Sequence, residues 1–166
     1  EKTMGEKLVQ LLREQNKTIS TMESCTGGGF ANEITNHEGA SEVLRFSAVT
    51  YSNEFKIKMG VPAEVIDKYT VYSMETAKEM SRHIAQFTKS NYGIGITGKL
   101  NRADKANKGG SDHTVFVSIY NQDVDTFTCF SLEAAPVSRM ENKAYIIHAI
   151  LEELVALIGE EDDKEN

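Results

Sequence analysis

The chain lacks the features that would place it in a membrane or on a nucleic acid. No apolar run approaches the length that spans a bilayer, and no charged and apolar leader opens the sequence. The 18 lysine and arginine residues are outnumbered by 25 aspartate and glutamate residues, so the formal charge is −7. General nucleic-acid binding needs a basic face. We therefore expect a cytoplasmic protein with neither a nucleic-acid partner nor a membrane association.

Cysteine and proline are scarce as well, with two residues of each. Cys25 and Cys129 lie far apart, which excludes a disulfide framework and a cysteine zinc site as the organising feature. The four histidines show no metal-ligand spacing; they are His37, His83, His113 and His148. We expect no metal and no other cofactor.

Patterns of apolar residues predict strands alternating with helices in one domain over residues 1–166. Predicted helices cover 4–15, 28–36, 53–59, a segment starting near Pro62, 73–89 and 138–158; predicted strands cover 17–23, 43–52, 92–97, 113–120 and 125–132. This order predicts an α/β fold, a three-layer α/β/α sandwich with a mixed, mainly parallel sheet. The polar stretch 98–112 has almost no apolar anchors and should form an exposed, mobile loop. The acidic tail 159–166 should fray.

Three consecutive glycines follow Ser24 and Thr26 in the segment "ESCTGGG", between a predicted strand and a predicted helix. Glycine amides and a helix N-terminus can hold an anion, so phosphate or carboxylate binding would account for residues 27–29. Thr26 is a candidate N-cap of that helix. A tight packing turn, with Ser24 hydrogen-bonded only locally, would account for the same residues. Both interpretations fit the pattern.

A serine nucleophile needs a base, and no histidine stands in an obviously paired position. A lysine serves instead when burial or a nearby cation lowers its pKa. Lys56 lies one helical turn after Asn53, behind the second predicted strand. It would reach the same sheet edge as Ser24 if the two strands are parallel. Taken alone, Lys56 would be interpreted as a surface lysine.

Several segments together resemble a known family: "ESCTGG", "AVTYSNEFK", "MGVP", "YGIGITG" and the spacing of the last helix. They are similar to the C-terminal domain of the competence/damage-inducible protein CinA, the nicotinamide-nucleotide amidase family, over roughly residues 4–158. The resemblance implies deamidation of nicotinamide mononucleotide to nicotinic acid mononucleotide and ammonia, without a metal, in pyridine-nucleotide salvage. It implies a small-molecule nucleotide as substrate, and we expect a homo-oligomer.

The resemblance also implies roles for individual residues. Ser24 would be the nucleophile, Lys56 its general base and Tyr51 a further catalytic residue. Substrate binding would fall to Thr26, Gly27, Gly28, Ser52, Asn53, Thr97, Gly98 and Arg139. Among these, Thr26 and the glycine amides would hold the phosphate or the oxyanion, and Arg139 would suit a phosphate. From its position alone, Arg139 is an exposed arginine at a helix start.

The chain departs from the family pattern after Gly98. The family continues with an Ile-Ala-Gly-Pro type turn and a proline-containing approach to the next strand. Here residues 99–112 contain no proline, and His113 stands where a glycine is usual. Val137 and Ser138 replace a Gly-Asp pair before Arg139. Two alternatives therefore stand beside the amidase: a catalytically impaired nucleotide-binding or regulatory CinA-like protein, and a hydrolase with a shifted substrate.

Overall fold

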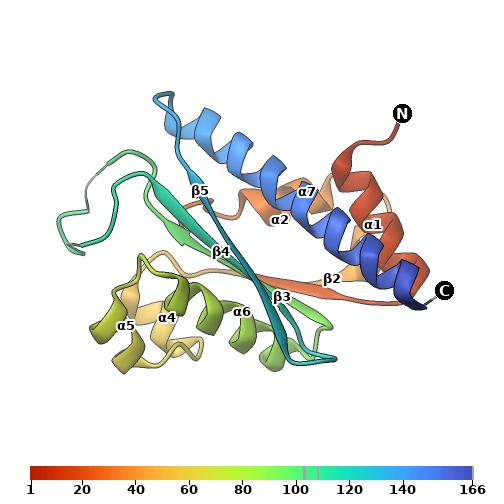
Figure 1. Ribbon diagram of the computed structural model, residues 1–166, viewed down its shortest axis with the longest axis horizontal. Coiled ribbons are helices and arrows are strands. Elements are labelled where there is room, and N and C mark those ends of the chain that lie inside the picture. Colours follow the sequence, from red (N-terminus) through yellow and green to blue (C-terminus); the bar gives the residue numbers. More distant parts are fainter. Residues whose placement is uncertain (103, 108, 166) are drawn as a thin grey trace.

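The computed structural model describes residues 1–102, 104–107 and 109–165, with only the backbone course for 162–165. The elements, in chain order, are α1 (Met4–Gln15), β1 (Ile19–Glu23), α2 (Gly29–Thr35), α3 (Ala40–Val43), β2 (Leu44–Val49), α4 (Asn53–Lys58), α5 (Ala63–Tyr69), α6 (Met74–Thr88), β3 (Tyr92–Gly98), β4 (Thr114–Asn121), β5 (Thr126–Glu133) and α7 (Arg139–Glu165). Helices α1, α2 and α7 cover one face of the sheet, and α4, α5 and α6 lie on the other (Figure 1).

The sheet has five strands in the order β2-β1-β3-β4-β5. Strand β1 pairs in parallel with both β2 and β3, and β4 pairs antiparallel with both β3 and β5. Four of the five strands therefore run in one direction, and β4 runs in the other. The predicted three-layer α/β fold with a mixed sheet is confirmed.

Each face of the sheet buries its own core, because side chains of a strand alternate between the faces. In β1, Ile19 joins the core under α1 and α7, whereas Met22 joins the smaller core under α5 and α6. Strand β3 places Ile94 and Ile96 in the larger core. Its Gly95 faces α6, where a Cβ would lie 2.3 Å from the backbone oxygen of Ala77. The helix backbone thus packs directly on the strand.

Polar side chains cap the helices that the sequence marks most clearly. Thr3 accepts a hydrogen bond from the Glu6 amide at the start of α1, and Ser73 accepts one from the Thr76 amide at the start of α6. These bonds satisfy amides that have no partner within the helix. Both helices match their predicted ranges within one residue at each end.

Two features differ from the sequence-based expectation. Helix α3 was not predicted, because four residues are too few to show a helical period. Helix α7 continues through 159–165, part of the acidic tail that we expected to fray; Asn166 lies outside the described residues. Extension of a formed helix needs no new nucleus, and glutamate and lysine are good helix formers.

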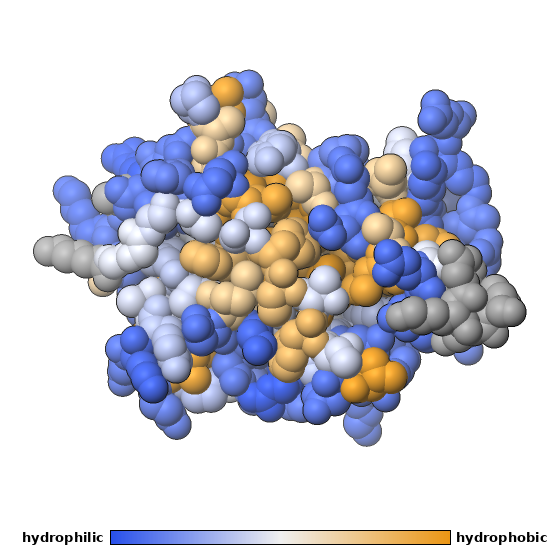
Figure 2. All heavy atoms as spheres, viewed as in Figure 1, coloured by the Kyte–Doolittle hydropathy of each residue, from blue (hydrophilic) through white to orange (hydrophobic). Residues whose placement is uncertain are grey.

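No helix in the described part of the chain is long and apolar enough to cross a membrane. Figure 2 shows hydrophilic residues around most of the outline of one face, with apolar residues gathered toward its middle.

Candidate active site

Ser24 and Thr50 lie side by side at one edge of the sheet. Strands β1 and β2 are parallel, and their last residues, Glu23 and Val49, are register partners. The pairing continues beyond them: the Thr50 amide donates to the Glu23 carbonyl at 2.8 Å, and the Ser24 amide donates to the Ile96 carbonyl at 3.0 Å. The segments that follow β1 and β2 therefore lie at the same end of the parallel strands, as predicted.

Lys56 reaches Ser24 because α4 begins directly after β2. Ser52 caps this helix by accepting from the Phe55 amide at 3.3 Å, which fixes where its first turn starts. Lys56 Nζ then lies 3.2 Å from Ser24 Oγ and donates to the Thr50 carbonyl at 2.7 Å. The lysine is only 2% exposed. The interpretation of Lys56 as a surface lysine is therefore wrong.

Burial lowers the pKa of Lys56 to about 8, because the charged ammonium loses its hydration. The charge of Asp104 acts in the opposite direction and raises this pKa. The sequence had suggested burial or a nearby cation as the cause; here it is burial. About a tenth of the lysine is then neutral at pH 7, which is enough for a general base.

The neighbouring thiol is a poor nucleophile. Cys25 is 5% exposed, and burial raises its pKa to about 12. The thiol therefore stays protonated, and the reactive form of cysteine is the thiolate. The hydrogen bond from Lys56 goes to the serine hydroxyl. Of these two neighbouring side chains, Ser24 is therefore the better candidate nucleophile.

Two of the three consecutive glycines are explained by the backbone conformation of the turn. Gly27 and Gly28 have φ angles of 62° and 92°, in the left-handed region that side chains disfavour. Gly27 donates its amide to the Ser24 carbonyl at 2.9 Å, and Gly29 donates to the Thr26 carbonyl at 3.0 Å. A Cβ on Gly29 would lie 2.8 Å from Ile147 Cδ1 on α7. The tight packing turn is the interpretation that these contacts favour.

Glu23 supplies the anion at the start of α2. Its fully buried carboxylate accepts from the Thr26 hydroxyl at 2.5 Å and from the Phe30 and Ala31 amides at 3.0 Å each. Negative charge at a helix N-terminus is stabilising. This position, where we expected Thr26 and the glycine amides to hold a phosphate, is therefore occupied by the chain itself. Gly28, rather than Thr26, is the N-cap. The sequence signal for Glu23 is only an acidic residue at a strand end.

A cavity of about 710 Å³ opens in front of Ser24 and Lys56. Its lining residues are Ser24, Cys25, Tyr51, Ser52, Asn53, Lys56, Val71, Tyr72, Gly98, Lys99, Leu100, Arg102, Asp104, Ala106, Asn107 and Arg139. The structure thus brings together seven of the predicted residues: Ser24, Lys56, Tyr51, Ser52, Asn53, Gly98 and Arg139. It does not bring Thr26, Gly27, Gly28 or Thr97 to the lining. The buried Thr97 hydroxyl donates to the Val71 carbonyl at 2.8 Å instead.

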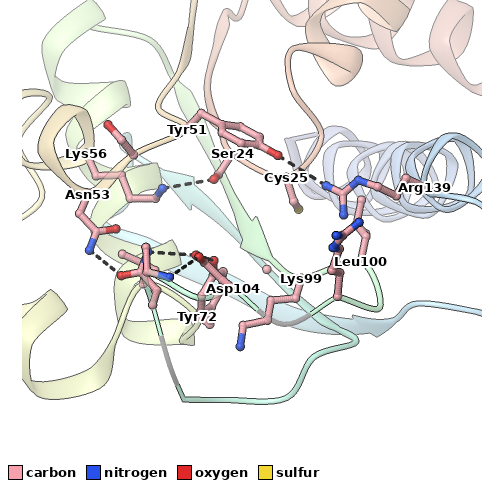
Figure 3. A pocket seen from close by; sticks show the side chains of 16 residues that line it. Ser24, Cys25, Tyr51, Asn53, Lys56, Tyr72, Lys99, Leu100, Asp104 and Arg139 are labelled. Atoms are coloured by element: carbon pink, nitrogen blue, oxygen red, sulfur yellow. Dashed lines mark hydrogen bonds between the residues drawn. The ribbon is translucent and has the colours of Figure 1, made fainter.

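Tyr51 and Arg139 meet at the mouth of the cavity. Arg139, the first residue of α7, donates a long hydrogen bond of 3.5 Å to the Tyr51 hydroxyl. Both side chains are exposed, Tyr51 by 64%. Figure 3 shows them to one side of the Ser24–Lys56 pair. Tyr51 thus contacts Arg139, and its catalytic role stays a prediction.

The loop that follows β3 contributes a polar wall that the sequence did not reveal. Tyr72 donates its hydroxyl hydrogen bond to Asp104, to which Asn107 also donates at 3.0 Å. Asn53 donates to Asn107 at 2.7 Å and so ties the wall to α4. The Tyr72 hydrogen bond is the main cause that lowers the pKa of Asp104 to about 2. Burial raises the pKa of Tyr72. Figure 3 shows Asp104 and Tyr72 facing the cavity below Ser24.

Lys99, the first residue of this loop, is buried and paired. It donates to the Gly109 carbonyl at 3.0 Å and to Asp112 at 3.1 Å, and its ammonium lies 4.7 Å from the centre of the Tyr72 ring. The loop residues that the structure describes are therefore anchored by several contacts. Ala103 and Lys108, which also belong to the predicted mobile stretch, lie outside the described residues.

Comparison with known proteins agrees with this architecture. A family model for the CinA C-terminal domain matches residues 1–158. The chain is 44% identical over 99 residues to a CinA-like protein of Kosmotoga olearia, a match that covers 59% of this chain and 24% of that protein. The chain thus spans about a quarter of the length of the curated relatives that it matches.

Two solved structures share the fold over nearly the whole chain. The competence/damage inducible protein CihA from Agrobacterium tumefaciens is 25% identical, with a TM-score of 0.83 and 93% of each chain covered. A competence or damage-inducible protein from Enterobacter asburiae is 24% identical, with a TM-score of 0.85 and coverage of 95% and 99%. From the family match and the shared fold, this chain belongs to the CinA C-terminal domain family.

Proposed function

We propose that this domain is an amidohydrolase that converts nicotinamide mononucleotide to nicotinic acid mononucleotide and ammonia. The observation that carries the proposal is the contact between Lys56 Nζ and Ser24 Oγ, 3.2 Å apart at a cavity wall. A buried lysine with a pKa of about 8 beside a hydroxyl is the arrangement that activates a serine nucleophile without histidine.

The reaction would proceed in two halves through an ester. In the first, neutral Lys56 takes the proton of Ser24 as Oγ attacks the carboxamide carbon, and the lysine then returns a proton to the leaving nitrogen. Ammonia departs, and the nicotinoyl group stays bound to Ser24. In the second, Lys56 takes a proton from water as the water oxygen attacks the ester, and the lysine returns this proton to Ser24 Oγ as the bond from Oγ to the acyl carbon breaks. The acid product then ionises to the carboxylate. The Thr50 carbonyl, 2.7 Å from Nζ, would hold the amine in place in both halves.

The cavity suits a small phosphorylated ligand. Its volume of about 710 Å³ lies within the range of small-molecule sites. Arg102 and Arg139 line it and are exposed, so their guanidinium groups are accessible to a phosphate. The phosphate would be bound by these side chains, since Glu23 occupies the start of α2.

The test is ammonia release from nicotinamide mononucleotide by the purified protein, together with calorimetric binding. Wild type should release ammonia, Ser24→Ala should bind the nucleotide but release none, and the exposed-site control Ser41→Ala should behave as wild type. Binding by wild type with no ammonia would favour the binding or regulatory alternative. Full turnover by Ser24→Ala would exclude Ser24 as the nucleophile.

A further inference from the structure

Charge is unevenly distributed around the cavity. Four cationic side chains line it among the residues that the structure describes: Lys56, Lys99, Arg102 and Arg139. Among the described lining residues, Asp104 is the only acidic one. A cavity with this surplus of positive charge should retain any anion, including the carboxylate that hydrolysis of an amide produces. An acidic side chain within it therefore needs an explanation.

Asp104 is held in place by three hydrogen bonds. Tyr72 and Asn107 donate to one carboxylate oxygen, Oδ2, and the Ala106 amide donates to the other, Oδ1, at 2.9 Å. Asn107 is itself fixed by Asn53 on α4. With a pKa of about 2, the carboxylate is ionised at every pH at which the protein would work. It is a fixed negative charge on the cavity wall.

The charge of Asp104 acts on the reaction centre. It raises the pKa of Lys56, and that lysine contacts Ser24 directly. Figure 3 shows Asp104 across the cavity from the Ser24–Lys56 pair. A carboxamide whose carbon is attacked by Ser24 would therefore lie in the electric field of the Asp104 carboxylate.

We propose that Asp104 is the residue by which this site distinguishes a neutral carboxamide from the corresponding carboxylate. The inference rests on the proposed amidase function. A carboxamide offers two N–H donors, which an ionised carboxylate accepts, whereas the acid product offers only negative oxygens. Asp104 therefore favours the substrate and repels the product, which promotes its release from a cavity that is otherwise cationic.

The experiment measures binding in the Ser24→Ala background, so that no turnover intervenes. Calorimetry gives the dissociation constants of nicotinamide mononucleotide and nicotinic acid mononucleotide. With Asp104 present, the amide should bind at least about tenfold more tightly than the acid. Adding Asp104→Asn should tighten binding of the acid and bring the two constants within about threefold of each other. Asparagine keeps one oxygen that Tyr72 and Asn107 can both use, and it loses only the hydrogen bond from the Ala106 amide.

Two control variants separate charge from architecture. Asp67→Asn removes a negative charge at an exposed position of α5 that does not line the cavity, so the ratio of the two dissociation constants should not change. Tyr72→Phe removes a hydrogen bond of the wall and keeps the Asp104 charge, so the preference for the amide should persist. Thermal denaturation of each variant reports whether the fold is intact.

Three results would overturn the proposal. Equal weakening of both ligands by Asp104→Asn would show that Asp104 only anchors the loop. If Tyr72→Phe bound the amide and the acid equally tightly, the preference for the amide would depend on the shape of the wall rather than on the charge of Asp104. Failure of both nucleotides to bind would exclude the discrimination altogether. Absence of ammonia from wild type, with the binding ratio as expected, would reject the amidase and leave the role of Asp104 supported.

Discussion

Glu23 and Ser24 are neighbours in the chain, but their side chains act on opposite faces of the sheet. The Glu23 carboxylate binds the amides at the start of α2, and the Ser24 hydroxyl contacts Lys56 on α4. Figure 1 shows these two helices on opposite sides of the strands. The end of β1 thus fixes a structural contact and a candidate nucleophile at once, and variants can separate the two.

Ser24→Ala and Lys56→Ala should each abolish ammonia release to a similar extent, and the double variant should be little worse. In the proposed mechanism each residue needs the other for the same step, so their effects should not add. The measurement is steady-state ammonia release by all three variants. Lys58→Ala, which alters an exposed lysine of the same helix, is the control and should keep full activity. Full turnover by Lys56→Ala would exclude the lysine as the base.

The pH dependence of kcat/KM should show a rise that ends near pH 8. In the proposed mechanism the base is the neutral form of Lys56, whose pKa is about 8, so kcat/KM should fall about tenfold per pH unit below that value. Asp104 raises this pKa, so Asp104→Asn should move the inflection to lower pH. Initial rates of wild type and Asp104→Asn between pH 5.5 and 9.5, a range of about four units that includes the pKa, would give the inflection of each protein. A profile that is flat from pH 6 to 9 would contradict a lysine base.

Glu23→Gln should destabilise the fold by about 2 kcal/mol. Both carboxylate oxygens accept hydrogen bonds, and glutamine replaces one of them with an NH2 group that cannot accept. The buried side chain receives three hydrogen bonds, two of them from the start of α2. Chemical denaturation followed by circular dichroism measures the loss. Glu38→Gln, at an exposed glutamate, should change stability little. Equal stability of the two variants would show that the carboxylate contributes nothing at this helix end.

Gly28→Ala should also be destabilising, by about 1–2 kcal/mol, because its left-handed backbone strains a residue with a Cβ. That Cβ would also lie 3.3 Å from Val49 Cγ2. Gly159→Ala is the matched substitution: it lies within α7 with nothing within 4 Å of the new Cβ. It should stabilise the protein by about 0.5–1 kcal/mol. Thermal denaturation of both variants tests the opposite signs.

Much of the fold could be predicted from the sequence, because its signals are local. The range of α1 follows from its apolar spacing, and the start of α6 follows from a capping serine. The expected proximity of Ser24 and Lys56 rested on two strands being parallel, which the order of elements favours. Helix α3 escaped prediction because a helix of four residues has no periodic pattern.

The rest of the site depends on contacts between segments that are distant in the sequence. Tyr72 and Asp104 are 32 residues apart, and Asn53 and Asn107 are 54 apart, so no spacing rule connects them. The loop from 98 to 112 has no apolar pattern, and polar side chains hold its described residues in place. The role of Glu23 could not be predicted, because the glycines after it are also typical of a site for an external anion. In the structure the Glu23 carboxylate itself accepts from the amides at the start of α2.

Because Glu23 occupies the N-terminus of α2, nucleotide binding should depend on ionic strength. A phosphate bound by buried amides would be shielded from salt. In the proposed site Arg102 and Arg139 would bind it instead, and both side chains are exposed. Mobile ions screen exposed charges over about 10 Å at 0.1 M salt. The Lys56–Ser24 pair, in contrast, is largely withdrawn from solvent. Added salt should therefore raise KM for a nucleotide substantially and leave kcat nearly constant.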